Sequence, residues 1–220
     1  MSYWPSLMLL GLAAPVMATT TVSGIKGQGQ SRVSGGLVLQ DASYETTNSF
    51  DVEGQILSFG YKTGVTPRLS LGLGLGYMID GELGDRVKIG DGNGFRLMFD
   101  GQYEVKNFSG NILIATFGLT HDRFKFEERN AKVDFTVTDM KIGGLVLHRI
   151  DKLAFYGGLD LYLFSNGDID YGNISDGVER DDRINIHLGA AFAIDPAFDI
   201  RADLYLIGEQ TLSFAVDVAM

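Results

Sequence analysis

The sequence predicts an all-β fold, a closed antiparallel up-and-down barrel that crosses a membrane with its strands. Three observations lead to this prediction. Apolar residues alternate with small or polar ones, short turns alternate with long polar connections, and an apolar run stands near the N-terminus. The length of 220 residues is enough for one barrel or sandwich domain.

The clearest alternation lies in residues 68–81, which read RLSLGLGLGYMIDG. In a helix, the leucines would scatter around the axis, and each glycine would cost about 1 kcal/mol relative to alanine. In a strand, leucine, tyrosine and isoleucine share one face, since side chains alternate with period 2. The apolar face would point to a core in a soluble sandwich and to lipid in a membrane barrel.

The rest of the chain repeats this pattern in runs long enough to cross a bilayer when tilted. We expect ten strands, with eight as the alternative if the first hairpin lies outside the wall. The expected strands are 32–44, 51–63, 68–80, 94–106, 110–126, 131–148, 152–164, 183–194, 199–207 and 211–219.

The connections between these strands alternate in length. Long polar connections fall at 80–93 and 165–183. Short turns on one side and long loops on the other are typical of bacterial outer-membrane barrels. An even number of strands places both ends of the barrel on the short-turn side, which faces the periplasm. Tight turns are expected at 64–67, 106–109, 149–152 and 194–197.

The N-terminus carries an apolar stretch over 7–17 that ends in a small-residue cleavage pattern at Ala18. This pattern predicts a secretory signal peptide. Because no lysine or arginine precedes the stretch, a buried N-terminal helix is the alternative. The expected organisation is a signal peptide over 1–18, a periplasmic lead-in over 19–30 and an outer-membrane barrel over 31–220.

Charge and composition exclude several classes of site. The net charge of −10 argues against nucleic acid, because phosphate binding needs a basic patch. The absence of cysteine removes disulfides and cysteine-ligated zinc. The acidic segment 165–183 lacks the spacing of a calcium-binding loop, so we expect a solvated surface loop. No cofactor, metal site or catalytic residue is expected.

Charged residues fall on the face opposite to the apolar one. Facing lipid, each would cost about 2–4 kcal/mol at the midplane, whereas in a narrow lumen they can pair. About eight strands leave just enough room for side chains, so we expect a largely filled lumen. Its charges could form a structural network or a small selective pore. The predicted lumen network consists of Arg96, Asp100, Glu104, Asp160, His187, Arg201, Asp203 and Asp217.

Aromatic residues lie near the ends of the expected strands and predict two interfacial girdles. Their general preference for strands is the alternative explanation. One girdle would contain Tyr44, Phe50, Tyr77, Phe95, Phe124 and Phe126, and the other Tyr61, Tyr103, Phe108 and Phe155.

The whole pattern resembles the small OmpA-like or OmpX-like outer-membrane β-barrel proteins of Gram-negative bacteria. The signal segment, the hairpin GYKTGVTPRLSLGLGLGY and the last strand TLSFAVDVAM carry this resemblance. In that family the last strand is read by the barrel-assembly machinery and usually ends in Phe or Trp, whereas this chain ends in Met220. The resemblance implies a monomer in the cell outer membrane. Its implied partners are outer-membrane lipid, lipopolysaccharide and the assembly machinery.

For function, we expect a non-catalytic barrel with a structural role, or with surface interactions through the acidic loops 80–93 and 165–183. A narrow, porin-like channel is one alternative. A lipid A-modifying enzyme that uses His187 is another, and we do not expect it, because no serine or carboxylate pattern accompanies the three histidines. A soluble barrel or sandwich is the alternative from another class of proteins.

Overall fold

The computed structural model describes residues 28–84, 88–128, 131–207 and 209–220, and β-strands make up its regular structure. The predicted signal peptide over 1–18 lies outside these residues. Within the described ranges, no helix is long and apolar enough to cross a membrane. The strands are β1 (Ser31–Glu45), β2 (Ser49–Thr66), β3 (Leu69–Gly84), β4 (Asn93–Phe108), β5 (Asn111–Glu128), β6 (Ala131–Ile150), β7 (Leu153–Tyr171), β8 (Ile174–Arg180), β9 (Ile184–Asp195), β10 (Phe198–Tyr205) and β11 (Glu209–Ala219).

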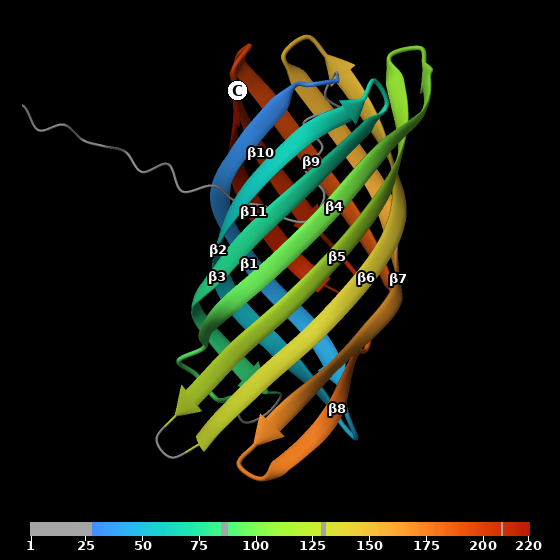
Figure 1. The fold of residues 1–220 in the computed structure, drawn as a ribbon. Helices are drawn as coiled ribbons and strands as arrows, with labels where there is room; N and C mark the ends of the chain where they lie inside the picture. Colours follow the sequence, from blue (N-terminus) through green and yellow to red (C-terminus); the bar gives the residue numbers. More distant parts are fainter. Residues whose placement is uncertain (1–27, 85–87, 129–130, 208) are drawn as a thin grey trace, which may run out of the picture.

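The strands form one antiparallel sheet that closes on itself (Figure 1). The last strand pairs with the first, from Arg32 opposite Ala219 to Ala42 opposite Glu209. Ten strands, all except β8, make the wall of this closed barrel, as predicted. The first hairpin, β1–β2, belongs to the wall, so the reason given for the eight-strand alternative is wrong.

The four predicted tight turns all lie at one end of the barrel, together with the C-terminus (Figure 1). In the turn between β4 and β5, Ser109 and Gly110 have φ angles of 48° and 83°. Positive φ at both central residues matches the twist of a tight two-residue hairpin turn. Outer-membrane barrels carry short turns on the periplasmic side. We therefore name this the periplasmic end and the opposite one the extracellular end.

The prediction of a long surface loop over 165–183 is wrong. Strand β7 continues to Tyr171, and a turn at Gly172 leads into β8, whose residue Val178 pairs with Gly167. Asp168 and Asp170 alternate with Gly167 and Ile169 on β7, and the acidic residues of β8, Asp176 and Glu179, are exposed. Because the outward face of this segment is polar, the segment lacks the apolar row from which the other strands were predicted.

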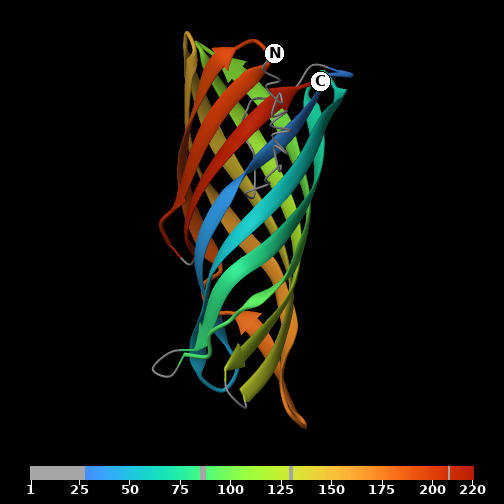
Figure 2. The same ribbon diagram turned by 90° about the vertical axis from the view of Figure 1, so that its left-hand side faces the viewer.

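The barrel narrows toward its extracellular end. Strand β10 ends at Tyr205, and β11 begins at Glu209, opposite Ala42 of β1. Beyond this level β1 pairs with β8, where Tyr44 lies opposite Arg180. The ring there consists of β1 to β7 and β8, which is eight strands. Figure 2 shows the β10–β11 hairpin ending well short of the long strands.

Candidate functional site

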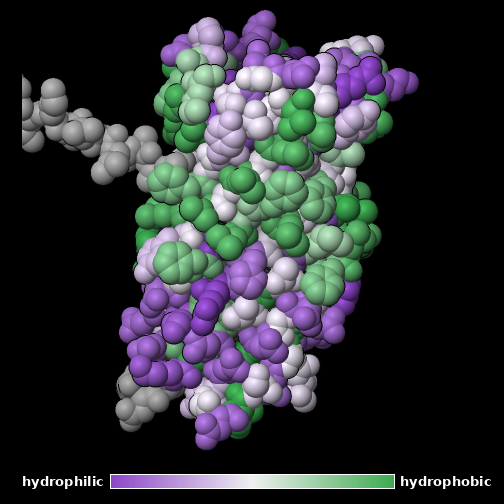
Figure 3. Space-filling model, viewed as in Figure 1, coloured by the Kyte–Doolittle hydropathy of each residue, from purple (hydrophilic) through white to green (hydrophobic). Residues whose placement is uncertain are grey.

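The outer surface carries a broad apolar belt. Leu73, Phe95 and Leu159 point outward and are 62%, 65% and 56% exposed. In Figure 3 hydrophobic residues form a band across the upper half of the visible face, and hydrophilic residues gather below it. Such a surface is stable only against lipid, and the closed wall satisfies the backbone hydrogen bonds that lipid cannot.

Toward the extracellular end, the inward and outward faces exchange their polarity. On β5, Phe124 and Phe126 are fully buried inside, whereas Arg123 and Lys125 are exposed outside. Strand β6 follows the same rule, with Phe135 inside and Lys132 outside. This part of the barrel therefore has a dry core and a wet surface, like a soluble protein.

We call this dry core the extracellular plug. The Phe135 ring contacts Tyr44 edge-on, with centroids 5.0 Å apart, and stacks against Phe124 at 6.4 Å. Aromatic and aliphatic side chains therefore pack together inside the narrow eight-stranded section. The plug consists of Val38, Ala42, Tyr44, Val52, Ile56, Met78, Leu83, Phe124, Phe126, Val133, Phe135, Val137 and Val178.

The plug corrects the prediction of an extracellular aromatic girdle. Tyr44, Phe124 and Phe126 are buried in the lumen and do not face the interface. Tyr77 and Phe95 do point outward, and their rings meet edge-on with centroids 5.1 Å apart. The sequence assigned them all to one level because aromatic residues favour strands on either face.

A buried ion-pair cluster lies where ten strands become eight. Arg180 of β8 donates hydrogen bonds to Asp139 of β6 at 2.8 and 3.0 Å, and one to the Tyr44 hydroxyl at 3.0 Å. Its guanidinium lies 4.3 Å from the centroid of the Tyr162 ring and 3.7 Å from Glu209 of β11. Tyr162 donates a hydrogen bond to Glu209 at 2.8 Å. This junction cluster joins β8 to the tip of the β10–β11 hairpin.

Further buried pairs line the lumen between the plug and the periplasmic end. Lys141 lies 3.1 Å from Asp160, whose same oxygen is 3.4 Å from Nδ1 of His187. Arg96 forms a bidentate pair with Asp122 at 2.6 and 2.5 Å. Each charge therefore has a nearby opposite charge, as burial in a low-dielectric interior requires.

A third group of charges lies nearer the periplasmic end. Arg201 contacts Asp203 at 2.9 Å and Asp217 at 3.2 Å. Tyr156 and Ser213 both donate hydrogen bonds to Asp203. This group links β10, β11 and β7, which lie close together along the wall, on the inner face.

Seven of the eight residues of the predicted network are buried inside the barrel, and Glu104 is the exception. Glu104 lies half-exposed near the periplasmic end of β4, and the structure gives its side chain no ion pair within the described ranges. The other seven form separate groups instead of one continuous network. The sequence reasoning missed their partners Lys62, Asp122 and Lys141. It also missed the separate junction cluster of Asp139, Arg180 and Glu209.

The alternation of inward and outward positions along the strands could have predicted that some of these residues point into the lumen. Asp122 stands three residues after the outward Leu119, and Lys141 stands next to the outward Ile142. Arg180 carried no such signal, because it lies in the segment predicted as a loop. This alternation does not predict which charges form ion pairs, because that depends on how the strands are staggered around the barrel.

The lumen does not support the catalytic role that the enzyme alternative gives to His187. That side chain is 1% exposed and lies between Asp160 and Tyr205 inside the wall, away from lipid. His121 faces outward and bonds Thr138 at 2.9 Å, so the two histidines share no site. In the part of the chain that the structure describes, no three acidic or histidine side chains could hold a metal ion.

The comparison with known proteins finds similarity in structure but none in sequence. No known protein family and no curated protein matches the sequence. The outer-membrane protease OmpT from Escherichia coli is similar in structure, with a TM-score of 0.52 and 8% identity over 86% of this chain and 94% of that one. The translocator domain of the autotransporter NalP from Neisseria meningitidis has a TM-score of 0.49 and 12% identity over 88% of each chain.

The likeness to OmpT concerns the fold and leaves the activity open, because the identity is low. The closed ten-stranded wall, the outward apolar belt and the short turns at one end agree with that fold. The chain has the fold of a small Gram-negative outer-membrane β-barrel protein, and its apolar belt places it in the outer membrane.

Proposed function

We propose that this protein is a non-conducting barrel that raises a rigid acidic surface above the outer membrane for contact with external partners. The single observation that supports this most is the extracellular plug, which fills the narrowed end of the barrel with aromatic and aliphatic side chains. Ions cannot cross a dry section of this kind, whereas a rigid extension is well suited to present a surface.

The surface around the plug is strongly acidic, and we call it the acidic collar. Its few cations include Lys88, whose hydrogen bond to Glu53 raises the pKa of the ammonium group. Such a field favours cationic partners over polyanions. The collar consists of Asp41, Glu45, Asp51, Glu53, Asp80, Glu82, Glu127, Glu128, Asp134, Asp168, Asp170, Asp176, Glu179, Asp181 and Asp182.

Two readouts test this proposal. In planar bilayers, the purified barrel is expected to give no conductance steps. On intact cells, an epitope inserted at the β7–β8 turn, between Gly172 and Asn173, is expected to bind its antibody.

Conductance steps that shift in Asp100→Asn or Arg96→Ala would favour the channel alternative instead. Staining only after permeabilisation would contradict the surface role. Hydrolysis of labelled lipid A that disappears in His187→Ala would favour the enzyme alternative.

A further inference from the structure

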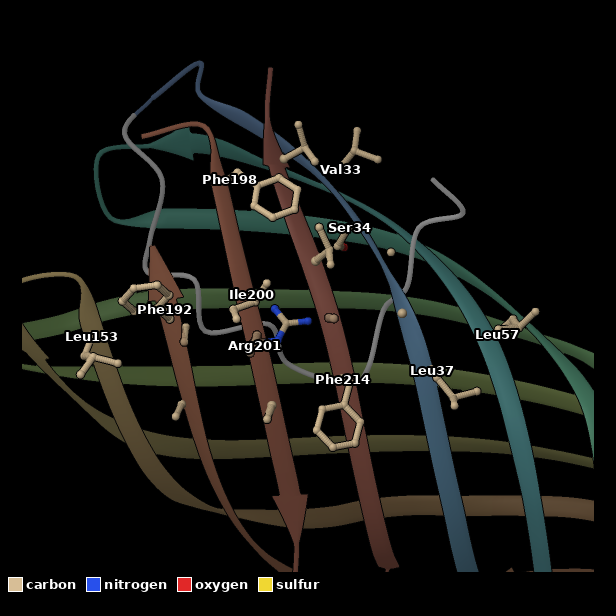
Figure 4. A pocket seen from close by; sticks show the side chains of 18 residues that line it. Val33, Ser34, Leu37, Leu57, Leu153, Phe192, Phe198, Ile200, Arg201 and Phe214 are labelled. Carbon is tan, nitrogen blue, oxygen red and sulfur yellow. The ribbon is translucent and has the colours of Figure 1, made fainter. Parts of the chain in front are cut away.

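Two apolar grooves hollow the outer surface of the wall. The larger, about 990 Å³, crosses the closing seam between Phe214 of β11 and Leu37 of β1 (Figure 4). Its charged lining residue, Arg201, is buried inside the barrel beside Asp203. This seam groove therefore offers an outside ligand only apolar contacts.

The second groove, about 820 Å³, crosses β1 to β5, and charged residues follow its extracellular end. It runs from Tyr61 near the periplasmic side to Leu119 and His121 on β5. The next outward residue on β5 after His121 is Arg123, followed by Lys125. An apolar groove therefore leads directly to two cations.

Arg123 lies at the extracellular edge of the apolar belt. It pairs in register with Phe95, whose ring meets Tyr77. Outward aromatic residues at this height mark the level of the lipid headgroups. Arg123 is exposed, and within the described ranges the structure gives it no ion pair. Lys125 is 3.4 Å from Asp134, in an exposed pair of little strength.

The sign of the charge singles out β5 from its neighbours. On five other wall strands, the first outward charge above the belt is acidic, and on β5 it is Arg123. This cation lies at the extracellular end of a groove that could take an acyl chain. The two features together are complementary to the charged headgroup and the acyl chain of an anionic lipid. The five acidic residues are Asp41 of β1, Glu53 of β2, Asp80 of β3, Asp134 of β6 and Asp168 of β7.

We propose that this surface binds one phosphorylated lipid of the outer leaflet. Its phosphate contacts Arg123 and Lys125, and one of its acyl chains lies in the groove that ends at Leu119. The planar guanidinium can hold a phosphate through two parallel hydrogen bonds, which a lysine cannot do. The site does not depend on whether the barrel conducts, so it stands apart from the proposed surface function.

The test uses the full chain, purified and folded in detergent, and titrated with lipid A that carries two phosphates. Bound lipid is counted by native mass spectrometry. Arg123→Gln is expected to weaken binding roughly tenfold or more, since a hydrogen bond to a charged group contributes about 1.5–3 kcal/mol. Arg68→Gln is the matched control, because it removes an exposed cation at the periplasmic end, and it is expected to change nothing.

A second pair of variants tests the groove. Leu119→Trp narrows its upper end and is expected to weaken binding, whereas Leu159→Trp, on the outward face of β7, is expected to leave binding unchanged. Gel shift on heating confirms that each variant is folded. Equal binding by Arg123→Gln and Arg68→Gln, or equal binding of lipid A stripped of its phosphates, would overturn the proposal. If inorganic phosphate displaced lipid A at a concentration equal to that of the lipid, the surface would be a simple anion site, and this result would also overturn the proposal.

Discussion

Replacing Arg180 by methionine is expected to lower the free energy of unfolding of the barrel by about 3–5 kcal/mol. The side chain is 3% exposed, and its loss leaves Asp139 and Glu209 buried without their cation. The loss also removes the ring contacts with Tyr44 and Tyr162. Because Arg180 joins β8 to the hairpin tip, we expect the extracellular end to open first. Urea unfolding followed by circular dichroism, in one fixed detergent, measures the change.

Arg183→Met provides the matched control for Arg180→Met. Arg183 lies three residues after Arg180 and forms an exposed ion pair with Glu179. An exposed pair of this kind contributes roughly 0.2–1 kcal/mol. Equal losses of stability in the two variants would show that the junction cluster has no special role.

Replacing Phe135 by alanine is expected to lower the free energy of unfolding by about 3–5 kcal/mol, as for other buried aromatic residues. Phe135 is fully buried at the centre of the plug, and its ring contacts Tyr44, Phe50 and Phe124. The loss combines the lost burial of the ring with a cavity that the surrounding strands fill only in part. The same urea titration gives the loss of stability.

Phe95→Ala is the control for Phe135→Ala, because it removes the same ring from a position 65% exposed on the outer wall. Detergent or lipid fills the space, so we expect a much smaller loss. A loss for Phe95→Ala as large as that for Phe135→Ala would mean that Phe135 does not pack in a dry core.

Period-2 alternation was sufficient to predict the membrane-spanning part of the wall. The strand expected over 68–80 is observed as Leu69–Gly84, and the one expected over 183–194 as Ile184–Asp195. This worked because lipid on one face and a polar lumen on the other impose opposite residue types at every second position.

The same rule could not predict the part beyond the membrane. Above the belt the inward face becomes apolar, so Phe124 and Phe126 were placed at the wrong surface. Strand β8 has water on its outer face and was taken for a loop, which hid Arg180. The narrowing from ten strands to eight depends on the pairing of β1 with β8 across 136 residues of sequence, and no local pattern records such a pairing.

In the membrane-spanning part of the wall, the apolar row of each strand faces lipid, while the charged row is enclosed in the lumen. The chain has no cysteine, so single cysteines carrying nitroxide labels can be introduced at Leu73 and at Asp168 without interference. In lipid vesicles, the label at Leu73 is expected to collide often with oxygen and rarely with a water-soluble nickel complex. The label at Asp168 is expected to show the reverse. A label at Leu73 that meets the nickel complex as freely as the one at Asp168 would show that the apolar row of β3 does not face lipid.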